Sequence, residues 1–241
     1  MVAERIVWID CEMTGLDLDV DELVEVAVIV TDFDLNPLDD GIDVVIRPSD
    51  RARDNMGDFV TTMHTTSGLI TELDGGTTVA DAQAQVLAYI RAHVPVSGKA
   101  PLGGNSVGTD RAFLVKQMPE VVDHLHYRII DVSSVKELAR RWHPRAYFQS
   151  PEKTGGHRAL GDIQDSIREL AYYRRAVFRQ EEPTSAEARA IAAEVIAAYA
   201  AAAPARSAEA APTPDGARAS AESSGEPSAE SGDGARAAAE D

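Results

Sequence analysis

The sequence predicts an α/β fold, and three observations support this expectation. Residues 5–9 are almost all apolar or β-branched, which is typical of a strand buried on both faces. Residues 78–94 carry apolar side chains at helical spacings. Beyond them, strand and helix patterns alternate from residue 101 to about residue 179. We therefore expect one domain, residues 1–180, in which helices flank a sheet.

The N-terminal part of this domain predicts a meander of three strands. The first strand continues to residue 12, and β-type runs at 22–32 and 41–47 supply the second and third. Pro48 ends the third strand. Residues 49–76 are polar and irregular, so we expect only short helical turns there.

The rest of the domain predicts two further strands and three further helices. A loop rich in Gly, Pro and Lys, residues 145–156, separates the last helix from the others. The Gly103–Gly108 segment resembles a phosphate loop, but it lacks the third-position glycine of the dinucleotide fingerprint, and no Lys-Ser/Thr follows. We therefore exclude a nucleotide-binding motif there. The elements are a strand at 101–105, a helix at about 110–118, a strand at 126–131, a helix from 131 to about 142, and a helix that follows His157 and ends near 179.

The composition changes after residue 180. Residues 181–203 are rich in alanine and predict a helix capped by Thr184 or Ser185. Residues 204–241 have hardly an apolar side chain larger than valine, so they cannot bury a core, and we expect a disordered acidic tail. The tail holds three Arg and eight Asp or Glu, a net charge of −5, which leaves −12 of the total −17 on residues 1–203.

The composition also excludes several classes of protein. A single cysteine, Cys11, rules out an internal disulfide framework and a cysteine-rich zinc site. No apolar run approaches the roughly 20 residues that span a bilayer, and Asp10 and Glu12 interrupt the N-terminal run, so no signal peptide is visible. We therefore expect a cytoplasmic protein without a membrane partner. The net charge of −17 argues against holding long nucleic acid on a basic face.

The first strand ends in two carboxylates. Side chains at i and i+2 of a strand point to the same face, so Asp10 and Glu12 converge while Cys11 turns away. Two such carboxylates repel each other unless one is protonated or a cation lies between them. Hard oxygen ligands without neighbouring cysteine or histidine suit Mg²⁺ or Mn²⁺. A solvated acidic strand end is the ordinary alternative.

Three later residues could complete such a site. Asp110 lies at the start of a predicted helix, where it could equally be an N-cap. His157 precedes the last predicted helix and could be an ordinary surface histidine. Asp162 lies in the first turns of that helix, where an acid also complements the helix dipole. Asp165 lies one turn further along the helix, where it complements the helix dipole less well. We therefore predict that it is a decoy, an acid close to the site that does not hold the metal.

In chain order, Asp10-x-Glu12, Asp110 and His157-x4-Asp162 resemble the site pattern of the DEDD exonuclease superfamily, and the histidine five residues before the last aspartate marks its DEDDh branch. The resemblance then narrows to the oligoribonuclease family and covers about residues 4–180. Four stretches carry it: WIDCEMTGL (8–16), GNSVGTDR (104–111), HYRIIDVSSVKELARRW (126–142) and ELAYYR (169–174).

The resemblance implies a ribonuclease H-like fold with a mixed sheet. It implies a homodimeric 3′-to-5′ exoribonuclease that degrades very short oligoribonucleotides, including dinucleotides, to nucleoside 5′-monophosphates. Two divalent ions, Mg²⁺ or Mn²⁺, would be held by Asp10, Glu12, Asp110 and Asp162, clamping the attacking water and the leaving oxygen. His157 would be the general base, since imidazole titrates nearest to neutral pH.

The resemblance also implies a set of substrate contacts. Leu16 would wedge against the 5′ base, and His64 would lie near the bases. Tyr127 would act in the site across the dimer interface. For Leu16 and Tyr127, the residues alone favour core packing as the alternative. A terminal-phosphate pocket would consist of Arg128, Ser133 and Ser134, with Ser106 nearby.

Other functions on the same fold are distinguishable by experiment. A general proofreading or RNA-trimming exonuclease of the DEDDh branch would act on longer strands. A catalytically silent nucleic-acid-binding module would release no mononucleotide in Mg²⁺ or Mn²⁺, although all five chemistry-bearing residues are present. A metal-dependent phosphatase would hydrolyse a chromogenic phosphate monoester.

Overall fold

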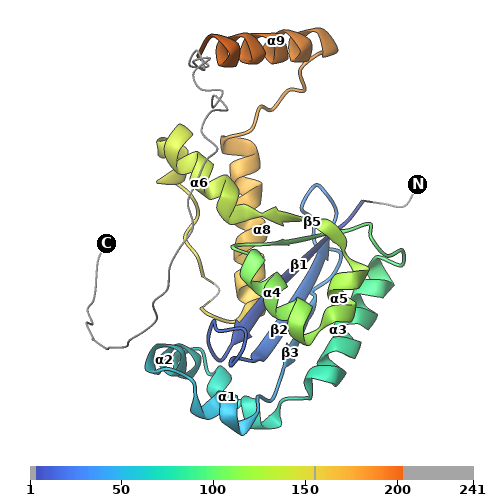
Figure 1. The fold of residues 1–241 in the computed structure, drawn as a ribbon, viewed down its shortest axis with the longest axis vertical. Helices are drawn as coiled ribbons and strands as arrows, with labels where there is room; N and C mark the ends of the chain where they lie inside the picture. Colours follow the sequence, from blue (N-terminus) through green and yellow to red (C-terminus); the bar gives the residue numbers. More distant parts are fainter. Residues whose placement is uncertain (1–3, 155, 203–241) are drawn as a thin grey trace, which may run out of the picture. The chain divides into compact units, whose positions relative to one another are not determined.

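The computed structural model describes residues 4–154 and 156–202 (Figure 1). The chain divides into two units, one ending at Glu182 and the other beginning at Pro183. The disorder predicted for residues 204–241 lies outside the described residues.

The first unit is built on a five-stranded sheet with the order β3-β2-β1-β4-β5. Strands β1, β2 and β3 pair antiparallel, whereas β4 pairs parallel with both β1 and β5. The predicted mixed sheet and its opening meander are therefore confirmed, with β1 in the middle. The strands are β1 (Ile6–Met13), β2 (Leu23–Thr31), β3 (Ile42–Val45), β4 (Pro101–Gly104) and β5 (His126–Asp131).

The helices of the first unit follow the predicted order, with some additions. Two short 3-10 turns, η1 and η2, lie among the helical turns expected between β3 and α3. The helices and 3-10 turns of the first unit are α1 (Asp50–Asp54), α2 (Asp58–Thr66), η1 (Leu69–Thr71), η2 (Leu73–Gly75), α3 (Val79–His93), α4 (Gly108–Gln117), α5 (Pro119–His124), α6 (Val132–Trp142), α7 (Pro144–Tyr147) and α8 (Ala159–Ala176).

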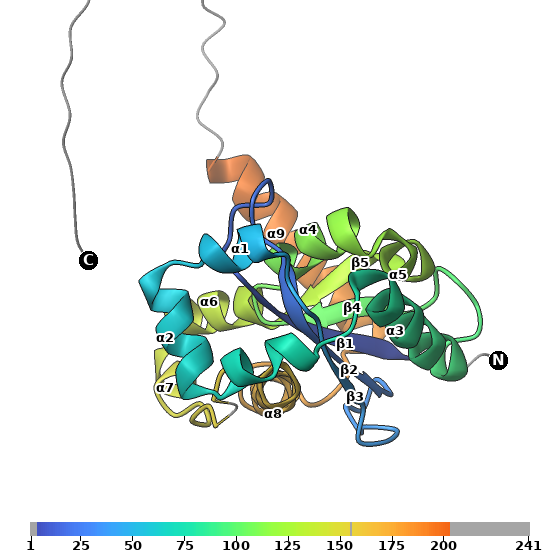
Figure 2. The same ribbon diagram turned by 90° about the horizontal axis from the view of Figure 1, so that it is seen from below.

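Strand β1 is buried on both faces, as its apolar run predicts. Ile6 and Trp8 belong to a core cluster that includes apolar residues of α8, whereas Val7, Ile9 and Cys11 belong to one that includes residues of α3, α4 and α5. Figures 1 and 2 show α8 on one side of the sheet and these three helices on the other. By the period-two rule, the side chains of even-numbered β1 residues face α8.

Two prolines begin helices that the sequence does not predict. The helix predicted at about 110–118 does end before Pro119, since α4 ends at Gln117, but this proline occupies the first position of a further helix, α5. The loop expected from residue 145 likewise begins with α7, which has Pro144 at its first position. Proline has no N–H and a fixed φ, which suits the first turn of a new helix as well as the end of an old one.

The second unit contains helix α9 (Ser185–Ala202). Of the two residues predicted to cap it, Thr184 does so. The Glu187 N–H donates to Thr184 Oγ1 over 3.3 Å, and the Glu187 carboxylate accepts from the Thr184 N–H over 2.8 Å, which makes a reciprocal capping box. Among the described residues, no helix combines the length and hydropathy that crossing a membrane would require.

Candidate active site

Three acidic side chains meet at the end of β1. Asp10 and Glu12 lie on the α8 side of the strand, and Asp162 lies in the first turn of α8. One carboxylate oxygen of each lies within 4.8 Å of one of each of the others. We call these three residues the acid cluster. Cys11 is buried in the core on the opposite face, as the strand alternation predicts.

Asp110 approaches the same strand from α4. Its Oδ1 accepts a hydrogen bond from the Cys11 N–H over 3.0 Å, and the residue is 7% exposed. The N-cap position of α4 belongs to Val107, so Asp110 is the third residue of the helix and the N-cap alternative is excluded. Its carboxylate is thus fixed against the backbone between Asp10 and Glu12.

These carboxylates strongly perturb one another. Burial raises the pKa of Asp10 well above its ordinary range, and the charges of Asp110, Asp162 and Glu12 raise it further. Burial, followed by the charge of Glu25 and then those of Asp162 and Asp110, raises the pKa of Glu12 to about 8. Burial likewise raises the pKa of Asp110 to about 6. The three carboxylates of the acid cluster are hard oxygen donors whose mutual repulsion a divalent cation would relieve, so they form a donor set that fits such an ion, whereas Asp110 is not part of the cluster.

An open cavity of about 510 Å³ lies beside the acid cluster. Its wall combines carboxylates with hydroxyl, amide, imidazole and ammonium groups, so it offers partners for both a cation and a phosphate. Besides the three acids, the lining residues are Asn105, Ser106, Ser133, Lys136, Lys153, Gly156, His157 and Ser166.

His157 enters this cavity from the turn that precedes α8. Its backbone is in the left-handed region, with φ of 59°, which is uncommon for a residue other than glycine. The next residue, Arg158, is the N-cap residue of α8. His157 and Asp162 therefore reach one cavity from a single turn-helix junction.

The sequence and the fold of this chain are similar to those of known proteins. The sequence pattern of the RNase_T exonuclease family covers residues 7–170. The chain is 65% identical to the oligoribonuclease of Streptomyces coelicolor over 192 residues, which span 79% of this chain and 96% of that protein. It is 59% identical to the oligoribonuclease of Leifsonia xyli, over 80% of this chain and 94% of that protein.

The chain belongs to the oligoribonuclease family. Among solved structures, Escherichia coli Exonuclease I in complex with a dT13 oligonucleotide matches with a TM-score of 0.56 and 14% identity, over 72% of this chain and 41% of that one. Exonuclease I from Methylocaldum szegediense matches with a TM-score of 0.54 and 17% identity, over the same shares of the two chains. These two likenesses establish the exonuclease fold.

The terminal-phosphate pocket that the oligoribonuclease pattern implies is only partly assembled in one chain. Ser106 and Ser133 line the cavity with their hydroxyl oxygens 3.0 Å apart, and Ser133 donates to Asn105 Oδ1 over 3.1 Å. Ser134 instead donates its hydroxyl to the Asp131 carboxylate at the cap of α6, over 2.6 Å. Ser134 is thus committed to its own helix end.

Arg128 lies on the edge strand β5 rather than in the cavity wall. Its guanidinium carbon is 5.4 Å from the centre of the Tyr127 ring. Tyr127 itself is 72% exposed, and Leu16, in the loop after β1, is 76% exposed. Core packing is therefore excluded for both Leu16 and Tyr127. Neither side chain lines the cavity of its own chain.

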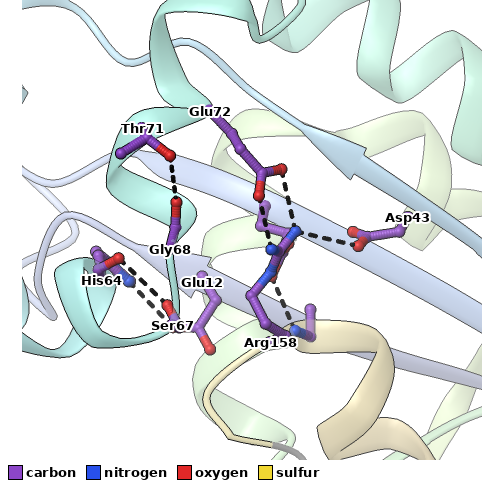
Figure 3. A network of polar contacts seen from close by, with 10 residues as sticks. Glu12, Asp43, His64, Ser67, Gly68, Thr71, Glu72 and Arg158 are labelled. Atoms are coloured by element: carbon purple, nitrogen blue, oxygen red, sulfur yellow. Dashed lines mark hydrogen bonds and ion pairs between the residues drawn. The ribbon is translucent and has the colours of Figure 1, made fainter.

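His64 is completely buried, which no sequence pattern indicates. Its Nε2 lies 2.9 Å from the Met13 carbonyl oxygen, and its Nδ1 lies 3.9 Å from Glu12 Oε2. Figure 3 shows the ring beside Glu12, on the C-terminal turn of α2. The ring thus lies behind Glu12 instead of at the surface of the cavity. Its contact with substrate bases stays a prediction.

Two cations in the cavity wall are absent from the predicted site. Lys136 lies one helical turn after Ser133, and its Nζ is 2.9 Å from Glu169 Oε1. Lys153 belongs to the loop before α8. The i+3 spacing from Ser133 could have indicated Lys136, whereas nothing in the sequence separates Lys153 from other loop lysines.

Asp165, the predicted decoy, is not part of the acid cluster. It is nevertheless not an ordinary surface acid, because it is 3% exposed. Its carboxylate accepts hydrogen bonds from the Thr154 N–H over 2.5 Å and from Thr154 Oγ1 over 3.2 Å, and it pairs with Arg168. Asp165 therefore ties the loop before His157 to α8.

Proposed function

We propose that this chain is a 3′-to-5′ exoribonuclease that degrades very short oligoribonucleotides, including dinucleotides, to nucleoside 5′-monophosphates. The observation that carries this proposal is the acid cluster, whose carboxylate oxygens lie within 4.8 Å of one another in a cavity that His157 also lines. Family membership supplies the reaction and the substrate class.

Asp10, Glu12, Asp110 and Asp162 would hold two divalent ions, Mg²⁺ or Mn²⁺. When bound, such a pair stabilises negative charge on the attacking and leaving oxygens of a phosphodiester. The raised pKa values of Asp10 and Glu12 support this assignment, because bound cations offset the repulsion that otherwise keeps these groups protonated.

His157 would accept the proton of the attacking water. The water oxygen forms a bond to phosphorus, and the bond from phosphorus to the 3′ oxygen of the preceding nucleotide breaks. The leaving 3′ oxygen takes a proton from solvent, so the products are a nucleoside 5′-monophosphate and an RNA with a free 3′ hydroxyl. Ser106 and Ser133 line the cavity and would hold the substrate, and the positive charge of Lys136 and Lys153 would attract its phosphate.

We also propose that the working form is a homodimer. Tyr127 and Arg128 are two of the predicted substrate residues that do not line the cavity of their own chain. Both lie on β5, which is the last strand of the sheet and has one unpaired edge in the part of the chain that the structure describes. A second copy could bring them to the site, where Tyr127 of the partner subunit would contact the bases and Arg128 of the partner subunit the 5′ phosphate.

Tyr127→Ala should therefore lower activity, and mixing should restore part of it. A Tyr127→Ala chain keeps its acid cluster, and an Asp10→Ala chain keeps its Tyr127. Each mixed dimer would contain one site with both elements, so refolding the two inactive chains together should recover roughly one working site per mixed dimer. Mononucleotide release is measured before and after mixing. Absence of recovery in a mixture that demonstrably contains mixed dimers would contradict the shared site.

The proposed preference for very short substrates follows from the net negative charge of the protein. Each phosphate that Lys or Arg neutralises contributes a slope of about −0.7 in log K against log salt on a single strand. With −12 on residues 1–203 and only two ammonium groups in the cavity, outer phosphates of a long strand meet repulsion. A dinucleotide escapes this repulsion, because its phosphates all lie inside the site.

We expect kcat/KM to be highest for RNAs of two to a few nucleotides, with a shallow salt dependence. The test is a time course on a gel with 5′-labelled RNAs of two to twenty nucleotides, with and without Mg²⁺ or Mn²⁺. A 5′ phosphate should improve cleavage, and Arg128→Ala should remove that benefit. Equal efficiency on a twenty-nucleotide RNA would instead identify a general exonuclease, and no mononucleotide release would identify a silent binding module.

A further inference from the structure

Arg158 connects four parts of the fold at the edge of the active site. It follows His157 directly and is the N-cap residue of α8. Its Nε donates to Glu25 Oε1 of β2 over 2.7 Å, and its two terminal nitrogens donate to the two carboxylate oxygens of Glu72, next to η2, over 2.8 and 3.2 Å. Asp43 of β3 lies 3.6 Å from Nη2. Figure 3 shows the guanidinium between Glu72 and Asp43.

Glu25 is the buried member of this network. It is 0% exposed, and it stands opposite Glu12 in the β1–β2 register. Its second oxygen, Oε2, accepts the Ala159 N–H over 2.8 Å, so a side chain from β2 satisfies a free N–H at the start of α8. A buried carboxylate without a partner is strongly unfavourable, which fixes Arg158 at this position.

His157 is therefore held between two attachments. On its N-terminal side, Asp165 binds Thr154 through two hydrogen bonds. On its C-terminal side, Glu25 binds both Arg158 and the Ala159 N–H. The left-handed φ of 59° at His157 is a strained conformation for a residue other than glycine, and it persists only when the surrounding structure imposes it.

We infer that Arg158 and Glu25 are positioning residues for the reaction and act through His157. Neither residue lines the cavity, so neither is expected to touch substrate. Their attachment to β2 fixes the turn that carries His157 relative to the acid cluster on the neighbouring strand β1. This inference rests on the proposed function and adds two residues that are absent from the predicted site.

The inference predicts a specific kinetic signature. Arg158→Met should lower kcat for dinucleotide cleavage by roughly 10- to 100-fold, because misplacing a reacting group by about 1 Å can cost 10²-fold. KM should change by less than about threefold, since the cavity wall is intact. The kcat of Arg158→Lys should lie between those of wild type and Arg158→Met, because an ammonium group keeps the charge but lacks the planar guanidinium that bridges Glu25 and Glu72.

A double-mutant cycle separates positioning from general stabilisation. If Arg158 acts through His157, adding Arg158→Met to a His157→Ala chain should change kcat by less than about twofold, since the group that it positions is already missing. Single-turnover cleavage of a dinucleotide with enzyme in excess measures both backgrounds. An equal loss of kcat in the two backgrounds, or an unchanged kcat in folded Arg158→Met, would overturn the inference.

Two further variants keep the result interpretable. Arg174→Met removes an ion pair with Asp34, 2.9 Å long, from the far end of the same helix, and should leave kcat unchanged. If Arg158→Met fails to fold in a thermal melt, Glu72→Gln, which removes one exposed partner of Arg158, takes its place in the cycle with an expected loss of a few-fold. Failure of the wild-type chain to cleave the dinucleotide would refute the proposed function itself, which is a different outcome.

Discussion

Glu12→Gln should abolish RNA cleavage and at the same time stabilise the metal-free protein at pH 8. Gln keeps the shape of the side chain but removes one negative charge from the acid cluster, so the proposed metal site would lose an anionic ligand. Turnover should fall by at least 10³-fold, comparable to the loss of a group on which the reaction depends. Mononucleotide release in Mg²⁺ measures the loss.

The stability effect has a sign that follows from the pKa of Glu12. Burial and neighbouring charges raise it from an ordinary value of 4.5 to about 8 in the folded protein. The fold thus favours the protonated form, and the resulting stability is present below pH 4.5 and is lost as the pH rises to about 8. Metal-free wild type should lose stability across this window, whereas Glu12→Gln should lose less.

Thermal melts at pH 5 and pH 8, with and without Mg²⁺, test both statements. Wild type should gain Tm from Mg²⁺ at pH 8, and Glu12→Gln should gain much less. Glu120→Gln on α5 is the matched control, because it removes an exposed carboxylate outside the acid cluster. A Glu12→Gln chain that turns over RNA normally would remove Glu12 from the metal site.

The sequence predicts the Asp10–Glu12 pair of the acid cluster well because the geometry of that pair is local. Strand alternation alone puts Asp10 and Glu12 on one face and Cys11 on the other, and the structure agrees. The sequence also predicts that Asp162 lies in the first turns of a helix, and the structure has it in the first turn of α8. What periodicity cannot supply is the crossing of elements that brings α8 and β1 together, and only the family resemblance provides it.

The residues that support the site could not be predicted in the same way. His64 lies in a segment without a clear apolar period, so its complete burial behind Glu12 leaves no trace in the sequence. In the sequence, Glu25 is an ordinary acidic residue of a predicted strand. Its structural role depends on its hydrogen bond with Arg158, which lies 133 residues away in the chain. Long-range ion pairs carry no local pattern, and each partner alone is an ordinary charged residue.

His157→Ala should slow the chemical step by about 10²–10⁴-fold, which is the usual contribution of a general base. Histidine is the side chain that most often acts as a general base, and His157 lines the cavity beside the acid cluster. The acid cluster does not include His157, so the carboxylate ligands remain. Mg²⁺ should therefore still raise the Tm of the variant, and dinucleotide binding should stay near the wild-type level.

The pH profile separates this role from a structural one. If His157 is the base, wild type and His157→Ala should differ in the pH profile of kcat, because the variant lacks the proposed proton acceptor while it keeps any dependence that comes from the metal ligands. His143→Ala, which removes an exposed histidine from the end of α6, should retain wild-type kcat and the same profile. A His157→Ala chain with wild-type kcat would show that another group accepts the proton. The proton acceptor would then be either a neighbouring carboxylate or hydroxide from bulk water. The pH dependence of kcat in that variant would distinguish the two. With a carboxylate, kcat reaches a plateau once the group is ionised, whereas with hydroxide kcat continues to rise with pH.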